Sequence, residues 1–134
     1  MNSRQLGVAI VSVVLSLGCS TRNAQTQTVT PDPVGVWRGT SRCTKLPSAC
    51  KDENVVYRIT RINTSDSLSI DAFKIVNGQE DEMGVIGCRV SGTQLRCPMP
   101  NGTWHFTVSR DSLVGDLKLP DNTKFRDVRT VRSR

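Results

Sequence analysis

Five cysteines carry the most direct chemistry in this sequence. Cys43 and Cys50 form one close pair and Cys88 and Cys97 a second, while Cys19 stands alone at the end of an apolar N-terminal stretch. Neither pair has the Cys-x-x-Cys spacing or the histidine neighbours of a zinc site, so we expect no bound metal. The four paired cysteines are therefore predicted to form two disulfide bonds, which persist in an oxidising compartment.

Other groups that could do acid–base or nucleophilic chemistry are sparse. The single histidine, His105, is predicted to face solvent, and no serine or cysteine motif places a nucleophile beside it. The acidic run Glu80-Asp81-Glu82 follows a hairpin turn, where we expect solvated carboxylates rather than a buried general acid. We therefore predict that the protein is not an enzyme and needs no cofactor.

The chain is basic, with a formal net charge of +6, and its C-terminal end carries much of this charge. A basic end attracts acidic partners or anionic lipid headgroups, and the alternative is a solvated strand face with a frayed tail. Single-stranded nucleic acids need aromatic platforms in a basic groove. Because Phe125 is the only aromatic residue in this basic end, we expect no nucleic-acid binding.

The N-terminus is typical of an exported protein. Arg4 precedes the apolar stretch 6–17, which is the arrangement of a secretory signal and is too short to span a bilayer comfortably. Leu15-Ser16-Leu17-Gly18-Cys19 resembles the lipobox of bacterial lipoproteins. The resemblance implies cleavage before Cys19 and acylation of its thiol, and ordinary signal cleavage further along the chain is the alternative.

These features divide the chain into a signal peptide at 1–18, a lipidated cysteine with a linker at 19–33, and a folded domain at 34–134. The linker is rich in Thr, Gln, Asn and Pro, so we expect it to be disordered. Fully extended, 20–33 spans roughly 45 Å. The sequence thus predicts a domain tethered to the bacterial cell envelope, on the periplasmic side of the outer membrane.

The part of the chain after Val34 is predicted to be all-β. It keeps no helical period, whereas alternating apolar residues and turn signals such as Asn77-Gly78 and Asn101-Gly102 recur along it. We expect a small antiparallel up-and-down barrel, or a strongly bent sheet, of about eight strands. The predicted strands cover 34–43, 54–62, 67–76, 79–90, 94–99, 102–109, 112–119 and 123–131.

Two of the turns predict a common apolar face. With Gly92-Thr93 as a turn, Cys88 lies opposite Cys97 in a non-hydrogen-bonded pair, which suits a cross-strand disulfide. With Asn101-Gly102 as a turn, Cys97 lies opposite Phe106, and the apolar face continues into the next strand.

A third turn conflicts with this face. Asn77-Gly78 pairs Ile70 with Val85, although Ile86 must point inward further along the same strand. A β-bulge between Val85 and Ile86 would resolve the conflict, and Gly84 or Gly87 would tolerate it.

Gly35-Val36-Trp37, at the start of the first predicted strand, resembles the Gly-x-Trp signature of the calycins, the group of lipocalins and fatty-acid-binding proteins. The resemblance implies that Trp37 closes one end of a barrel and packs on a basic residue near the last strand, which by position is Arg129. Small cysteine-stapled barrels of this type are also similar to bacterial metalloprotease-inhibitor lipoproteins.

Strand parity adds detail to the surroundings of Trp37. Gly35 and Gly39 share its face and are predicted to leave room for the indole, with Phe125 or Val131 beside it.

Two functional hypotheses follow. The first is a membrane-tethered binding domain whose barrel takes a small apolar or amphipathic ligand. The second is a periplasmic inhibitor or protein-interaction module that contacts an envelope protein through loops at the barrel rim, such as 44–51. A cavity favours the first hypothesis, and a core filled by side chains favours the second.

Overall fold

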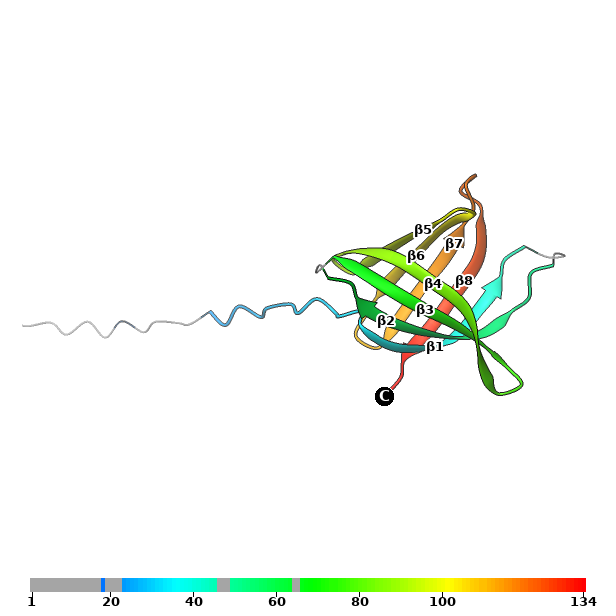
Figure 1. Cartoon of the computed structure of the whole chain (residues 1–134). Helices are drawn as coiled ribbons and strands as arrows, with labels where there is room; N and C mark the ends of the chain where they lie inside the picture. The colour runs from blue at the N-terminus through cyan, green and yellow to red at the C-terminus, as the bar shows by residue number, and fades with distance from the viewer. Residues whose placement is uncertain (1–17, 19–22, 46–48, 64–65) are drawn as a thin grey trace, which may run out of the picture.

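The computed structural model describes residue 18 and residues 23–45, 49–63 and 66–134, and within them the chain forms eight strands (Figure 1). No helix in this described part is long and apolar enough to cross a membrane. The strands are β1 (Gly35–Cys43), β2 (Glu53–Arg61), β3 (Ser67–Val76), β4 (Gln79–Ser91), β5 (Gln94–Met99), β6 (Gly102–Val108), β7 (Ser112–Lys118) and β8 (Lys124–Arg132).

The eight strands close into an antiparallel barrel. Each strand pairs with the next one along the chain, and β1 pairs with β8 to complete the circle. The all-β, up-and-down architecture predicted from the alternating pattern is therefore confirmed. Because successive strands run in opposite directions, the N-terminal segment, the 92–93 turn and the C-terminus lie at one end of the barrel, which we call the base (Figure 1).

The core is built by side chains at alternate positions of every strand, as the period-two pattern requires. Trp37 and Phe106 are its largest fully buried members. Partly buried apolar residues complete it at its margins, among them Ile86 and Leu117. The buried cluster comprises Trp37, Val55, Tyr57, Ile59, Leu68, Ile70, Ala72, Cys88, Leu95, Cys97, Trp104, Phe106, Val108, Leu113 and Val128.

Trp37 lies near the base, at the start of β1, and its side chain is fully buried. Its indole Nε1–H donates to the carbonyl oxygen of Pro33 at 2.9 Å, and the guanidinium of Arg132 lies 4.1 Å from its ring centroid. Arg132 also donates to the backbone oxygens of Asp32, Val34 and Arg110, at 2.6, 2.9 and 3.0 Å. One arginine thus fastens the start of the barrel to its last strand.

The arginine beside Trp37 is Arg132, and the prediction of Arg129 is wrong. Val128 and Thr130 are buried, so the even-numbered positions of β8 face inward and Arg129 faces outward, exposed. Val131 shares that outward parity and is 62% exposed, while Phe125 lies at the opposite end of β8.

Gly35 and Gly39 do not make room for the indole of Trp37, as was predicted, but for groups of β8. A Cβ on Gly39 would fall on the backbone of β8 at Arg129 and Thr130, and one on Gly35 would meet the guanidinium of Arg132. Gly39 therefore allows β1 and β8 to approach closely where the barrel closes.

The predicted strand pairing is correct for the β4–β5 hairpin and wrong by two residues for the β5–β6 hairpin. Around Gly92-Thr93 the predicted pairing is confirmed, with Val90 opposite Leu95. In the next hairpin Met99 pairs with Gly102, so the turn is Pro100-Asn101 rather than Asn101-Gly102.

This register difference moves each pair by two residues. Cys97 consequently lies opposite Trp104 instead of Phe106, although every side chain keeps its predicted face. The physical reason is that Gly102 belongs to β6, where an added Cβ would collide with the carbonyl oxygen of Lys118 on β7. The glycine permits a close strand approach and not a turn.

The predicted β-bulge exists but lies two residues earlier. The register between β3 and β4 shifts between Ala72 and Phe73, so that Met83 and Gly84 together lie opposite Ala72. Gly84 has φ +135°, a conformation that side-chain-bearing residues rarely adopt, which explains why the bulge is here and not between Val85 and Ile86.

One junction of the barrel wall is short. β4 pairs with β5 at Arg89, Val90 and Ser91, and the disulfide between Cys88 and Cys97 ends this pairing. Beyond it, residues 79–87 pair with β3 alone among the strands that the structure describes.

Candidate ligand-binding site

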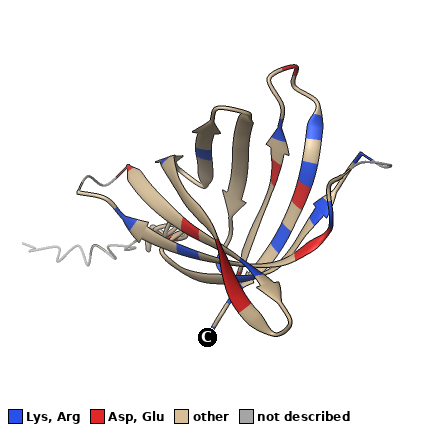
Figure 2. Cartoon of the chain, turned by 45° about the vertical axis from the view of Figure 1, so that its right-hand side comes forward, with Lys and Arg blue, Asp and Glu red and all other residues tan. Residues whose placement is uncertain are grey.

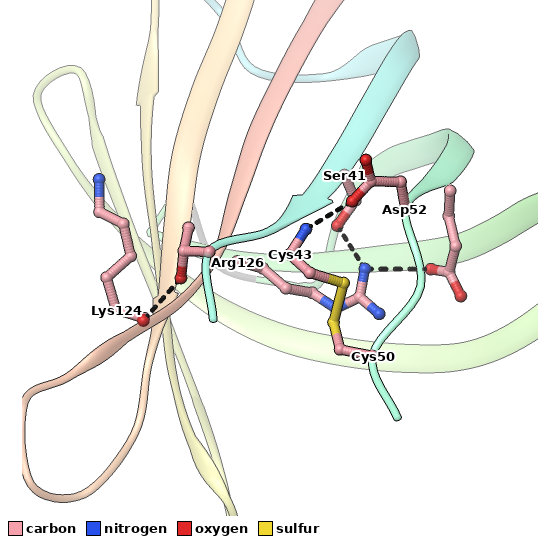
Figure 3. The surroundings of a disulfide bond; sticks show 8 residues. Ser41, Cys43, Cys50, Asp52, Lys124 and Arg126 are labelled. Atoms are coloured by element: carbon pink, nitrogen blue, oxygen red, sulfur yellow. Dashed lines mark hydrogen bonds and ion pairs between the residues drawn. A yellow bond between two sulfur atoms is a disulfide. The ribbon is translucent and has the colours of Figure 1, made fainter. Parts of the chain in front are cut away.

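Both predicted disulfides are present. Cys43 and Cys50 join across the β1–β2 connection, and Cys88 joins Cys97 across the short β4–β5 junction. The first bond lies beside a small polar cluster, in which Asp52 accepts a hydrogen bond from the Cys43 amide at 2.8 Å (Figure 3). Cys19, the predicted acylation site, lies outside the described residues.

An apolar pocket opens beside the short junction, between the outer part of the β3–β4 hairpin and the β5–β6 hairpin. Its volume is about 180 Å³. Three of its lining residues are exposed at the mouth: Met83 at 42%, Val85 at 63% and Met99 at 41%. The other lining residues are Tyr57, Ile70, Ala72, Gly84, Ile86, Trp104 and Phe106.

Aromatic rings form one side of the pocket. Trp104 and Phe106 stack with centroids 5.6 Å apart and ring planes 8° from parallel, and Tyr57 meets Phe106 edge-on at 6.0 Å. Both arrangements are among the favoured geometries for aromatic pairs. The rings are held in place by the core, so this side of the pocket is preformed.

Three polar residues, Ser41, Glu53 and Arg126, surround the hydroxyl end of Tyr57. Arg126 donates to the hydroxyl of buried Ser41 at 3.2 Å and lies 3.5 Å from Glu53 (Figure 3). Burial raises the pKa of Tyr57 well above its usual range, although Arg126 opposes this effect. Tyr57 therefore stays neutral at physiological pH and contributes its hydroxyl only as a hydrogen-bonding group.

The pocket depends on how the β3–β4 hairpin is held. The hairpin bends at the bulge toward β1 and β2, whose Arg38 and Arg58 reach Glu80. On β3, Phe73 lies opposite Val56 of the neighbouring strand β2. Val56 faces outward and is nevertheless only 1% exposed. The guanidinium of Arg58 covers the Phe73 ring at 4.6 Å, so an apolar contact outside the barrel supports the hairpin.

Ion pairs of Glu80 fasten the hairpin in this position. Its carboxylate lies 2.8 Å from Arg58 and 3.4 Å from Arg38. Glu80 belongs to the acidic start of β4, the long red segment of Figure 2, whereas Arg38 lies on β1 and Arg58 on β2. The hydrogen bond from Arg58, aided by the positive charges of Arg58 and Arg38, lowers the pKa of Glu80 below its ordinary value of 4.5.

We expect Glu80→Gln to loosen the hairpin without unfolding the barrel, because the ion pairs are largely in solvent. Amide hydrogen exchange over 73–82 should be faster in the variant than in the wild type at pH 7. Because the folded-state pKa is lowered, the contribution of Glu80 is present above pH 4.5 and is lost as the pH falls through the folded pKa. The two proteins should therefore exchange alike at low pH. Glu82→Gln is the control, and equal exchange of Glu80→Gln and the wild type at pH 7 contradicts this role.

His105 lies on the outer face of the barrel, away from the pocket. Its Nδ1 is 3.8 Å from a carboxylate oxygen of Asp116, too long for a hydrogen bond. Lys124 lies 3.7 Å from Asp116 and 3.1 Å from Asp127, which raises the lysine pKa mainly through its hydrogen bond to Asp127. Among the described residues no three His, Cys, Asp or Glu side chains form a group that could hold a metal ion.

Sequence reasoning missed the residues that form the pocket. The conflict of faces around Met83, Val85 and Ile86 was the available signal, because the inserted residue there turns apolar side chains toward the mouth. Arg132 shares the inward parity of Val128 and Thr130 on β8, and this parity is the signal that distinguishes it from Arg129.

Comparison of the chain with protein-family models, with curated proteins and with solved structures gave no match.

Proposed function

We propose that this protein is an exported binding protein that holds one apolar group of a small apolar or amphipathic ligand in the pocket beside the β4–β5 junction. The observation that supports this role is the combination of a preformed aromatic side with apolar residues exposed at the mouth. Contiguous exposed apolar residues are a feature of ligand-binding grooves and interaction surfaces, whereas singly exposed ones are ordinary. The role is binding rather than catalysis, since the pocket has only the Tyr57 hydroxyl as a titratable group.

The pocket volume limits what can enter. At about 180 Å³ it is smaller than the cavities of roughly 300–1,000 Å³ that enclose drug-sized ligands. It is close to the roughly 150 Å³ of an engineered cavity that holds one benzene molecule. The ligand therefore inserts a single ring or the end of a short chain, and the rest of it stays outside the barrel.

Export and anchoring complete the proposal. The two disulfides point to an oxidising environment outside the cytosol. We propose that the lipobox-like Leu15-Ser16-Leu17-Gly18-Cys19 supplies a lipid anchor and that the barrel is a calycin-like domain at the periplasmic side of the outer membrane. The base, where Asp32 and Val34 are held by Arg132, would then be the end nearer the membrane.

We expect Ala72→Leu to abolish this binding, because the larger side chain fills the pocket from the inner wall. The test uses the full chain with Cys19→Ser, which removes the predicted acylation, and methyl-¹³C methionine. Met83 and Met99 both line the pocket, so their methyl resonances report its occupancy directly. Toluene and octanoate should shift both resonances of the otherwise wild-type chain with saturation, and should leave those of Ala72→Leu unchanged.

Val108→Leu is the matched control, since Val108 is equally buried in the core but does not line the pocket. It should bind both probes as the wild type does. If neither probe shifts the methionine resonances, or if Ala72→Leu binds normally, the pocket is not a binding site.

A further inference from the structure

The pocket adjoins a strand edge that has no partner within the described chain. Residues 79–87 of β4 pair with β3 on one side, and β5 pairs with β4 only from Arg89 onward. Where β4 and β5 no longer pair, β5 continues as Pro98 and Met99, and Pro98 has no backbone N–H to donate to a neighbouring strand. A row of backbone N–H and C=O groups of β4 therefore stays available for pairing.

The side chains of this edge are distributed in a particular way. Glu80, Asp81 and Glu82 give its first half three carboxylates, and residues 79–87 contain no Lys or Arg. Met83, Val85 and Ile86 in its second half line the pocket. The edge is thus acidic at one end and apolar at the other, whereas the chain as a whole is basic.

We propose that an extended basic segment of a partner polypeptide adds to this edge as a further strand and places one large apolar side chain in the pocket. The inference rests on the pocket of the proposed function and names its occupant. Strand addition uses main-chain hydrogen bonds for affinity and side-chain pockets for specificity, which are the two features found here side by side.

The dimensions agree with such an occupant. Nine residues of strand are about 30 Å long at roughly 3.3 Å per residue, so the edge accommodates a segment of similar length. Successive side chains of the segment alternate between the barrel mouth and solvent. A pocket of about 180 Å³ has room for one side chain of the size of leucine or phenylalanine.

Charge determines which segment fits. Lysine or arginine residues of the partner would lie near Glu82, which is exposed, and near Asp81, whose contact with Lys74 is long at 3.7 Å. A second copy of this chain is a poor occupant, because its residues 79–87 offer no Lys or Arg to meet these carboxylates, and a parallel pairing would place the two acidic runs beside each other.

The test uses a palindromic nine-residue peptide with phenylalanine at its centre, lysine at the even positions, which share the outer face with Glu82, and threonine at the other odd positions. The palindrome presents the same side chains in a parallel or an antiparallel orientation. We expect it to bind the full Cys19→Ser chain with shifts of the Met83 and Met99 methyl resonances and with slower amide exchange in 79–87. Glutamate in place of lysine should weaken binding at least tenfold.

Two N-methylated versions of the peptide test strand pairing itself. One carries the methyl groups on its threonine amides and the other on its lysine amides. Because successive N–H groups of a strand point to opposite edges, one version should lose binding at least tenfold and the other should retain it. Equal binding of both versions would overturn the proposal.

Protein variants locate the site. Glu82→Lys should weaken binding of the lysine peptide about tenfold, while Asp111→Lys, which makes the same charge change at the base, should leave it unchanged. If toluene and octanoate bind but the peptide does not, strand addition is wrong and the proposed function stands. If no probe binds, both fail. If sedimentation shows a dimer with slowed exchange in 79–87, a second copy occupies the edge and the proposal is wrong.

Discussion

Trp37→Ala should destabilise the protein by about 3–5 kcal/mol, a large part of the stability of a domain of this size. The side chain is fully buried, so its removal leaves a cavity at the base of the barrel. The substitution also removes the hydrogen bond that the indole N–H donates to the Pro33 carbonyl oxygen, and it removes the ring whose centroid lies 4.1 Å from the Arg132 guanidinium. Denaturant unfolding followed by circular dichroism measures the loss.

Two further variants show whether the loss has this cause. Trp37→Phe keeps a ring for Arg132 to cover and should cost less than Trp37→Ala. Val131→Ala, on the same end of the barrel but 62% exposed, should change the free energy of unfolding by less than about 0.5 kcal/mol.

Fluorescence supplies an independent check on Trp37. In a Trp104→Phe background, Trp37 is the only tryptophan and should emit at short wavelength and resist acrylamide quenching. Readily quenched emission at long wavelength, with an unchanged melting temperature for Trp37→Ala, would show that Trp37 does not close the barrel.

Replacing Cys88 and Cys97 together by alanine should cost about 3–5 kcal/mol and open the barrel wall. The chain-entropy model assigns roughly 2–3 kcal/mol to a bond that closes so short a loop. A second contribution arises because both side chains are buried in the core, at 5% and 0% exposure, and their sulfur atoms would leave a void. This bond also lies at the end of the only pairing between β4 and β5 in the described chain.

The pair Cys43 and Cys50 is the matched control. It closes a loop of similar length, with a sequence separation of 7 against 9, but both of its cysteines are partly exposed, Cys43 at the end of β1 and Cys50 in the connection that follows. Its double alanine variant should lose the entropic contribution alone and should leave amide exchange in β4 and β5 unchanged. Accelerated exchange in these strands for both double variants, or for neither, would contradict a special role of Cys88–Cys97 in closing the wall.

The fold class was determined locally, and for this reason the sequence alone was sufficient to predict it. Alternation of apolar residues places each side chain on one of two faces, and this parity survives even a register error, as the β5–β6 hairpin shows. The shift from the predicted pair Cys97 and Phe106 to the observed pair Cys97 and Trp104 changed the neighbours but not the faces. The Cys88–Cys97 bond was predictable because a turn fixed its register within ten residues.

What only the tertiary structure decided involves segments far apart in the chain. The choice of Arg132 over Arg129 depends on which face of β8 meets β1 when the barrel closes, and a motif in β1 carries no information about that parity. Gly39 lets the backbone of β8 come close to β1, and Gly102 lets the backbone of β7 come close to β6. No local sequence pattern reveals either contact. The pocket arises because the bulge at Gly84 bends the β3–β4 hairpin toward β1 and β2, away from β5. The sequence could require a bulge from its own conflict of faces, but it carried no information on the direction of the bend. That direction depends on the ion pairs of Glu80 with Arg38 and Arg58, which join β4 to two strands with which it does not pair.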